Sequence, residues 1–496
     1  MRPTVNNVRR HFMLYGLWLF LLAVLIGRLL LLMVWQPVVG GGHIGTVRWR
    51  MDEEHFHVRM TDDGRGHILF ADGAIWSPPS TLQAGRVQQA PAAIGPELVG
   101  TIGQPDVWPS GARVLPEAGR TGLEYALDTL LMSKRPNLVG DLRVAANGGA
   151  LDKAKLPVTK QPYTIRAERG SDVITTIDET DERRAEAVLQ RVKVAHGAIV
   201  SLELPSAKVR VLASANHRRS DALVAATPGS IFKIMTAAAA LDTHAYPEQA
   251  RFFCDGQVHW PHVRMHCWRA HGKISFVDAI AQSCDVTFAQ IGIHLGRRPL
   301  EAEAKRFGLF TSGIENFKGH ALLPGANSGV LYRQRGADAG LLANTAIGQE
   351  DVRMSPLQGA LMAATIAEHG QYRKASLIDG VQKGRHRETY VPQFPSAACD
   401  AFTADVISQG MWAAVHAPKG TAHALNALPI AAKTGTAELP NGNVNAWLIG
   451  YQVNEKDEPV RAFALCVENE AGWAAHKKLF EMAQAWFGNL PHVTAP

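Results

Sequence analysis

An apolar run near the N-terminus constrains the architecture of this 496-residue chain more than any other feature. Residues 12–27 carry no charge, Arg28 interrupts the run, and residues 29–35 continue it. The 24 residues of 12–35 would extend roughly 36 Å as an α-helix, which exceeds the ~30 Å hydrocarbon core of a bilayer. We therefore predict one transmembrane anchor over residues 12–36.

The charges around this run predict its orientation. Three arginines precede it, and no acidic residue occurs before Asp52. By the positive-inside rule, residues 1–11 form a cytoplasmic tail and the rest of the chain lies outside the cytoplasm. A cleaved signal peptide is the alternative, but its apolar core is only about 7–15 residues long and ends in small residues. Because Gln36 and Pro37 follow this longer run, we expect a single-pass protein of the inner (cytoplasmic) membrane with a periplasmic body.

The composition excludes several classes of protein. Hydrophobic residues make up 46% of the chain and charged residues 19%, which is typical of a globular protein rather than a disordered one. The mean hydropathy of −0.06 excludes a protein with many membrane spans. The net charge is only +6, and no basic run is interleaved with aromatic residues, so we expect no nucleic-acid partner.

The pattern of residues predicts two parts after the anchor. Residues 37–168 are rich in glycine, proline and short β-like runs, and contain no constellation of catalytic side chains. Beyond them the pattern changes: Asp178 is placed to cap a helix over about 180–194, and alternation predicts a hairpin over 197–214. Helical and strand patterns mix through the remainder. We predict a β-rich N-terminal domain over 37–168 and one α+β domain over 169–490.

The first motif that carries chemistry is Ser230-x-x-Lys233, which follows Pro228-Gly229 and precedes an alanine-rich helical run. Pro-Gly before Ser predicts a helix start, so the serine lies in the first turn and the lysine shares its face. A serine hydroxyl needs an adjacent base, and a lysine whose pKa is lowered by burial and cationic neighbours can serve. The free backbone N–H groups of a helix start also suit an oxyanion.

The second motif is Ser283-Cys284-Asp285, between helical patterns over 276–282 and 286–295. A loop here can aim the hydroxyl and the carboxylate to the same side, where one relays a proton and the other orients a lysine. Taken alone, the motif fits a helix N-cap better.

The third motif is Lys433-Thr434-Gly435-Thr436, in the strand-like run 428–437. Alternation places Lys433 and Gly435 on one face of the strand, and Thr434 and Thr436 on the other. The missing side chain at Gly435 permits close approach of another backbone. The threonine hydroxyls beside the lysine side chain form a group that suits the binding of a carboxylate.

Taken together, the three motifs resemble the signature of the penicillin-binding protein transpeptidases: Ser-x-x-Lys, Ser-x-Asn and Lys-Thr-Gly, in that order. Residues 65–68 and 119–124 are similar to the N-terminal pedestal of class B members. The resemblance implies an α+β fold of the serine β-lactamase-like type, an antiparallel sheet with helices on both faces, after a β-rich pedestal and one transmembrane helix. Asp285 stands where the signature has Asn, as in some elongation-type class B members.

The resemblance implies roles for the motif residues. Ser230 attacks the carbonyl of a D-Ala-D-Ala stem peptide, releases the terminal D-Ala and forms an acyl-enzyme; β-lactams acylate the same serine. Lys233 takes the serine proton, and Ser283, helped by Lys433, passes a proton to the leaving amine. Asp285 can hold Lys233 charged or pair with Lys433. A neighbouring stem-peptide amine then resolves the ester and cross-links the wall.

The same resemblance implies binding residues and partners. The hydroxyls of Thr434 and Thr436, on either side of Gly435, hold the terminal carboxylate, and the N–H groups of Ser230 and Thr436 form the oxyanion hole. Acyl transfer requires no cofactor. The implied partners are peptidoglycan stem peptides, β-lactams, a membrane glycan polymerase and other cell-wall synthesis proteins. A D,D-carboxypeptidase and a non-catalytic β-lactam-binding scaffold or sensor are the alternatives.

A possible metal site overlaps the second motif. Cys254, Cys267, His271 and Cys284 follow the spacing C-x12-C-x3-H-x12-C. Three thiols and an imidazole form a full tetrahedral set for a structural zinc. A Cys254–Cys267 disulfide, plausible outside the cytoplasm, and free thiols are the alternatives.

Overall fold

The computed structural model describes the following parts of the chain: residues 56–62, 64–78, 80–83, 86–89, 91–103, 118–133, 137–142, 163–165, 169–217, 219–314, 323, 326–333, 336 and 338–488. The chain divides into two compact units, Met1–Thr61 with Asn137–Arg166 and Asp62–Pro136 with Ala167–Pro496. Within the described residues, no helix combines the length and apolar character needed to cross a membrane. The predicted anchor over 12–36 lies outside the described residues.

The first unit contains a three-stranded sheet in the order β1-β7-β8. The strands are β1 (Phe56–Asp62), β7 (Asn137–Leu142) and β8 (Tyr163–Ile165). Strands β7 and β8 run antiparallel, with Leu138 opposite Ile165. This sheet therefore joins β1 to β7 across roughly 80 positions of the sequence, and β7 to β8 across roughly 25.

The second unit begins with short elements held together by a buried arginine. Arg65 donates from Nη2 to Glu124 Oε2 at 2.6 Å and from Nη1 to Asp128 Oδ1 at 2.7 Å. Because a buried guanidinium requires charged or hydrogen-bonding partners, this ion-pair network fixes the two pedestal-like segments against each other. The elements are β2 (Ile68–Leu69), β3 (Ser80–Gln83), β4 (Arg86–Gln89), α3 (Pro96–Val99), β5 (Ile102–Gly103), β6 (Ala118–Gly119), α4 (Gly122–Ala126) and α5 (Asp128–Leu131).

A five-stranded antiparallel sheet forms the centre of the second unit, in the order β11-β10-β20-β19-β18. Its strands are β10 (Gly197–Glu203), β11 (Lys208–Ser214), β18 (Ile430–Glu438), β19 (Val444–Val453) and β20 (Pro459–Glu470). The β10–β11 hairpin falls where alternation in the sequence predicts one. Strand β18, which carries the third motif, is an edge strand, so one row of its backbone groups is free to face a ligand.

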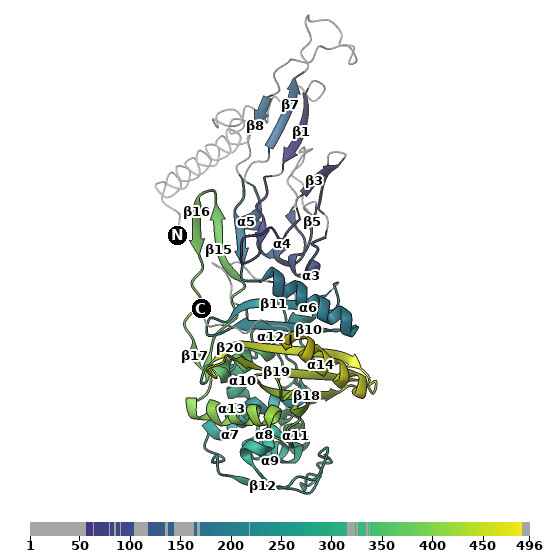
Figure 1. The fold of residues 1–496 in the computed structure, drawn as a ribbon, viewed down its shortest axis with the longest axis vertical. Helices are drawn as coiled ribbons and strands as arrows, with labels where there is room; N and C mark the ends of the chain where they lie inside the picture. The colour runs from purple at the N-terminus through teal and green to yellow at the C-terminus, as the bar shows by residue number, and fades with distance from the viewer. Residues whose placement is uncertain are drawn as a thin grey trace, which may run out of the picture. The chain divides into compact units, whose positions relative to one another are not determined.

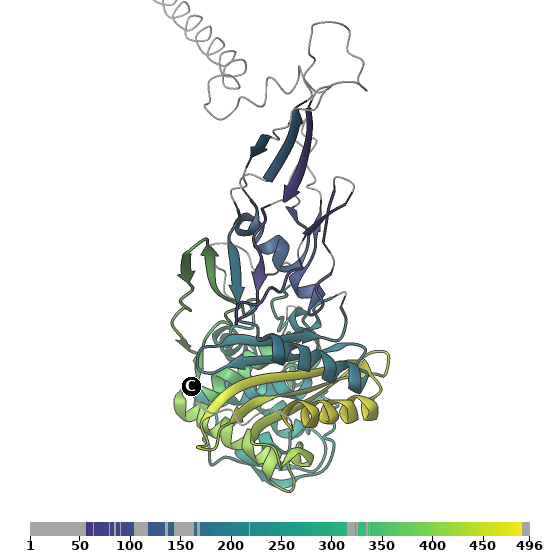
Figure 2. The ribbon, with the colours of Figure 1, turned by 45° about the horizontal axis from the view of Figure 1, so that its top comes forward.

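Helices cover both faces of this sheet (Figures 1 and 2). On one face, α6 (Glu179–Val192) and α14 (Gly472–Phe487) form a buried cluster with alternate strand residues such as Ile199. On the other, α7 (Lys233–Asp242), α12 (Pro356–Ala367) and α13 (Ala401–His416) pack against residues such as Val200. Because successive strand residues point to opposite faces, one sheet supports two apolar layers. This architecture confirms the expected mixed helix and sheet fold.

The remaining elements connect these layers. They are η1 (Asp221–Leu223), η2 (Gly229–Phe232), β12 (Arg251–Cys254), β13 (Gly272–Ser275), α8 (Phe276–Ala281), α9 (Asp285–Leu295), α10 (Arg297–Arg306), α11 (Ala339–Ala346), β14 (Gln371–Tyr372), β17 (Ser396–Ala397) and η3 (His423–Leu425).

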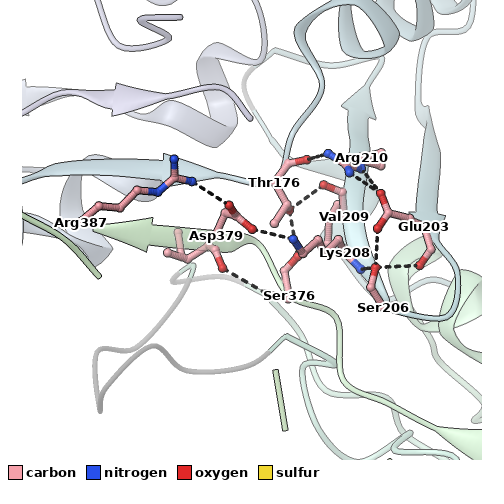
Figure 3. Close-up of polar contacts among 10 residues, drawn as sticks. Thr176, Glu203, Ser206, Lys208, Val209, Arg210, Ser376, Asp379 and Arg387 are labelled. Carbon is pink, nitrogen blue, oxygen red and sulfur yellow. Dashed lines mark hydrogen bonds and ion pairs between the residues drawn. The ribbon is translucent and has the colours of Figure 1, made fainter. Parts of the chain in front are cut away.

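A smaller sheet, β16-β15-β9-β2, is joined to the β10–β11 turn by the polar network in Figure 3. It contains β9 (Asp172–Thr175), β15 (Ile378–Lys383) and β16 (His386–Thr389). Thr176 Oγ1 lies 2.7 Å from the carbonyl oxygen of Val209 and 2.9 Å from that of Ser376. Lys208 Nζ donates to Asp379 Oδ1 at 2.6 Å. These contacts fix the smaller sheet to the end of the central one.

Candidate active site

The serine of the first motif lies on a tight turn that touches the edge strand. Ser230 belongs to the 3-10 helix η2, which leads directly into α7. Gly229 has φ +58°, and a Cβ there would lie 2.2 Å from the carbonyl oxygen of Thr436. A Cβ at Gly435 would lie 2.7 Å from the carbonyl oxygen of Pro228. Only glycines permit this approach, so the two motifs meet backbone to backbone.

The lysine of the first motif reaches the second motif. Lys233 Nζ donates to the carbonyl oxygen of Ser283 at 2.8 Å, to its Oγ at 3.1 Å and to Asp285 Oδ1 at 2.7 Å. The lysine side chain is 1% exposed and that of Asp285 19%. Among the hydrogen bonds of the described residues, none joins Lys233 Nζ to Ser230 Oγ. The Nζ of Lys233 is therefore held by the second motif, one helical turn from the serine.

Ser283 owes its position to the way α8 ends. Its N–H donates to Ile280 O at 3.2 Å, and the N–H of Cys284 donates to Ala279 O at 3.0 Å. This pair of bonds is a Schellman motif, which requires a left-handed residue and usually contains glycine there. Ser283 adopts φ +53°, so the loop aims its hydroxyl at the lysines at some cost in backbone strain. Ser283 and Asp285 do not cap α9. The N-cap position is held by Cys284, whose side chain makes no capping hydrogen bond.

Lys433 completes a row of three polar groups. Its side chain is fully buried, and Nζ donates to Ser283 Oγ at 2.8 Å and to the carbonyl oxygen of Thr434 at 2.9 Å. Burial and the nearby ammonium group of Lys233 lower the pKa of Lys433 well below its usual value, although Asp285 opposes this shift. The Ser283 hydroxyl therefore lies between two lysine amines, an arrangement that can pass a proton.

The outer edge of β18 faces the serine turn with its backbone groups, and its two motif threonines lie on the partly exposed face of the strand. Thr434 and Thr436 are partly exposed, whereas Lys433 and Gly435 are buried, in the alternation that the sequence predicts. Thr436 O accepts a hydrogen bond from Gln349 Nε2 at 3.1 Å, at the free edge of the strand. Because the N–H and C=O of one strand residue point to the same side, the N–H of Thr436 also points to this edge. It is placed to donate to an oxyanion.

Three further residues of the site lie outside the three motifs. Gln349 contacts the backbone of Thr436, Thr421 accepts a hydrogen bond from Thr434 Oγ1 at 2.7 Å, and His476 Nε2 lies 3.2 Å from Thr436 Oγ1. Tertiary packing brings all three to β18 from other elements. Spacing along the chain gives no signal for Thr421 and His476.

The predicted metal ligands also come together. The potential ligand atoms of Cys254, Cys267, His271 and Cys284 all lie within 4.8 Å of one another. All five cysteines are free thiols, so the alternative disulfide is not formed. A hydrogen bond from the Cys284 thiol lowers the pKa of Cys267 to about 5, against the opposing effect of burial. The Asp285 N–H donates to Cys267 Sγ at 3.3 Å, so this cluster supports the second motif.

Comparison with known proteins agrees with this geometry. The sequence matches the penicillin-binding protein transpeptidase domain over residues 199–484, more than half of the chain. The chain therefore belongs to the penicillin-binding protein transpeptidase family, which confirms the resemblance inferred from the three motifs.

Individual relatives support the same assignment. The peptidoglycan D,D-transpeptidase PbpA of Mycolicibacterium smegmatis is 32% identical over 260 residues, 49% of this chain and 50% of the relative. The match thus spans half the length of that relative. Pseudomonas aeruginosa PBP2 superposes with a TM-score of 0.65 at 22% identity, over 86% of this chain and 96% of the other. A chain of a peptidoglycan synthase complex superposes with a TM-score of 0.65 at 20% identity, over 99% of this chain and 100% of the other.

Proposed function

We propose that this protein is a peptidoglycan D,D-transpeptidase of class B. The observation that carries the proposal is the Ser283 hydroxyl, held between Lys233 Nζ and Lys433 Nζ at 3.1 and 2.8 Å beside the Ser230 turn. Family membership and relatives that carry this activity support the same conclusion. The reaction is acyl transfer between two stem peptides.

In the acylation step, Ser230 Oγ attacks the carbonyl carbon of the penultimate D-Ala. The new C–O bond forms, the peptide bond to the terminal D-Ala breaks, and the serine proton passes to Lys233, which takes part in this step as the neutral amine. Ser283, with Lys433 behind it, delivers a proton to the departing amine. Lys233 then returns the proton taken from Ser230 to Ser283 Oγ, which lies 3.1 Å from its Nζ. The depressed pKa of Lys433 favours its neutral amine, which stays hydrogen-bonded to Ser283. Backbone N–H groups of Ser230 and Thr436 stabilise the oxyanion.

In the second step, an amine of a neighbouring stem peptide attacks the ester carbonyl. A peptide cross-link forms, the ester bond breaks, and Ser230 recovers its proton. The edge of β18 would hold the donor throughout, with the terminal carboxylate of the donor on the hydroxyl face. A β-lactam would acylate Ser230 by the same attack, because its ring amide replaces the scissile bond.

The experiment that tests this proposal is acylation of the purified full chain by a fluorescent penicillin. We expect covalent labelling of the wild type and none of Ser230→Ala. Assay with a D-Ala-D-Ala stem peptide and an acceptor amine then separates the outcomes. Cross-linked product supports the transpeptidase, D-Ala release without cross-linking indicates a carboxypeptidase, and no labelling of folded wild type would contradict the enzyme proposal in favour of a scaffold.

We further propose that residues 12–36 anchor the protein in the inner membrane, with the catalytic part in the periplasm. The uncharged run and the arginines before it support this orientation. The likeness to a chain of a peptidoglycan synthase complex supports a membrane glycan polymerase as partner. Protease digestion of intact spheroplasts checks the orientation: we expect cleavage of the catalytic part from outside, and full protection would contradict it.

We also propose that Cys254, Cys267, His271 and Cys284 hold a structural zinc ion. Three thiolates and one imidazole match the preferred ligands of zinc, and the four ligand atoms already converge. The N–H of Asp285 donates to Cys267 Sγ, and a hydrogen bond of this kind orients and stabilises a thiolate that binds a metal. Bound zinc would supply a rigid cross-link between the β12–β13 region and the second motif, and it takes no part in acyl transfer.

Zinc content measured by mass spectrometry tests this site. We expect about one equivalent in the wild type and a loss of it in Cys267→Ser. The matched control is Cys399→Ser, a buried cysteine outside the cluster, which should retain the metal. Absence of zinc from wild type purified without chelators, or equal zinc in Cys267→Ser, would contradict the proposal.

A further inference from the structure

A histidine of the C-terminal helix contacts the hydroxyl face of β18. His476 lies in α14, and its Nε2 is 3.2 Å from Thr436 Oγ1. Both side chains are partly buried. Thr436 thus contributes its backbone N–H to the serine side of the strand and its hydroxyl to the side where His476 lies.

The two hydroxyls on this face are not equivalent. Thr434 Oγ1 donates to Thr421 Oγ1 at 2.7 Å, and Thr421 Oγ1 lies 3.4 Å from the carbonyl oxygen of Ala281. Thr434 therefore donates its hydroxyl proton to another residue of the protein, Thr421, and not to a ligand. Among the hydrogen bonds of the described residues, the hydroxyl of Thr436 has His476 as its only side-chain partner. Thr436 is the hydroxyl whose proton a ligand can receive.

We propose that His476 is a positioning residue that donates from Nε2–H to Thr436 Oγ1 and so directs the threonine proton at the terminal carboxylate of the donor stem peptide. This inference rests on the proposed transpeptidase function and extends it to substrate recognition. A hydroxyl that accepts one hydrogen bond donates a stronger one. The opposite arrangement, with Thr436 donating to the ring, would turn its proton away from the substrate.

The environment of the ring suits this role. Burial lowers the pKa of His476, so the imidazole is neutral near pH 7 and carries a single N–H. A neutral donor of this kind orients Thr436 through its hydrogen bond alone. Recognition of the carboxylate then depends on a directed hydrogen bond as well as on the lysine.

Three variants of the full chain test the proposal with a stem peptide that ends in D-Ala-D-Ala. In His476→Phe, which keeps the ring volume and removes the N–H, we expect KM to rise about tenfold with kcat changed less than about twofold. That change corresponds to one directed hydrogen bond made equally in ground and transition states. His476→Gln, whose amide can replace Nε2–H, should restore most of the wild-type KM. Lys477→Gln, an exposed neighbour on α14, is the control and should match the wild type.

A substrate with a C-terminal carboxamide separates recognition from structure. Because the amide is a poorer acceptor and carries no charge, wild type and His476→Phe should have similar KM values for it. An equal loss on both substrates would show a structural role and overturn the proposal, as would an unchanged KM for the carboxylate substrate. Absence of penicillin labelling in the wild type would instead contradict the proposed function, so the two failures are distinguishable.

Discussion

Ser283 combines backbone strain with a central place in the hydrogen-bond network of the site. Its φ of +53° is a conformation that glycine adopts at little cost and that other residues adopt at roughly 1 kcal/mol or more. The hydroxyl it presents accepts hydrogen bonds from both Lys233 and Lys433. Strain retained at such a position is consistent with a role in the reaction rather than in stability.

Two substitutions separate the effect of the Ser283 hydroxyl from that of its backbone strain. Ser283→Ala removes the hydroxyl and keeps the strain, and Ser283→Gly removes both. Since a positioned proton relay contributes on the order of 10²-fold or more, we expect both variants to be acylated by penicillin about 100-fold more slowly. Thermal unfolding should show Ser283→Gly to be the more stable of the two, by about 1 kcal/mol. Acylation of Ser283→Ala at the wild-type rate would exclude the relay.

Sequence spacing identifies the residues of this site that belong to motifs, but not the residues that support them. Ser230, Lys233 and Lys433 stand out because each lies in a short pattern with a chemical reason. Thr421 and His476 reach β18 from distant elements, and their neighbours in sequence give no indication of this contact. The left-handed conformation of Ser283 is equally hidden, since the sequence has serine where glycine would signal it.

At the scale of single elements, local signals predict the structure well. Helix α6 begins one residue after Asp178, whose carboxylate accepts from the N–H of Asp181 at 3.0 Å, as the predicted cap requires. The predicted hairpin and the two helices around the second motif also occur, with ends shifted by at most one residue. The order of strands in the central sheet could not be predicted, because β10 pairs with β20 across about 260 residues and such pairing leaves no local signature.

The packing of α3 against α6 buries a carboxyl group that should make stability depend on pH. The side chain of Glu97 is 2% exposed, one of its oxygens has no hydrogen-bond partner among the described residues, and Glu186 lies close by. Burial raises the pKa of Glu97 to about 7. The folded state therefore binds this proton more tightly than the unfolded state, in which the carboxyl titrates near 4.5.

We predict that the free energy of unfolding falls as pH rises from about 4.5 to 7 and then levels off with respect to this group. The fall amounts to about 3 kcal/mol at most, from a shift of roughly two and a half pKa units. Glu97→Gln should remove this part of the dependence, so that the variant exceeds the wild type in stability at pH 8. Urea denaturation at pH 5 and pH 8 measures the free energy of unfolding of each variant. Substitution of the exposed Glu481, Glu481→Gln, is the control. A pH dependence identical to that of the wild type would exclude Glu97 as its source.

At the scale of the catalytic unit, the site lies at a joint, the line of contact between the helical layer and the central sheet. The serine and its lysine belong to the helical layer through η2 and α7, whereas Lys433 and the threonines belong to the sheet. Gly229, Gly348 and Gly435 line this joint, and a Cβ at each would meet neighbouring backbone at 2.7 Å or less. The geometry of the reaction therefore depends on how closely the two layers approach.

Gly435→Ala tests this dependence because the added methyl lies in the joint itself. Its Cβ would lie 2.7 Å from Pro228 O and 2.9 Å from Ile231 Cγ2, so the strand and the serine turn must separate by several tenths of an ångström. A displacement of this kind at the reacting groups can reduce the rate of acylation about 100-fold, whereas overpacking at one position costs about 1–3 kcal/mol of stability. We expect a folded protein with slow penicillin acylation.

Gly472→Ala is the matched control, since its Cβ would meet only Val444 Cγ1 at an ordinary 3.8 Å. It should be acylated like the wild type. Stopped-flow acylation and thermal unfolding, measured on both variants, separate the effects on rate and on stability. If Gly435→Ala were acylated at the wild-type rate, the separation of the layers would not govern the reaction, and the close approach of the glycines would be a matter of packing alone.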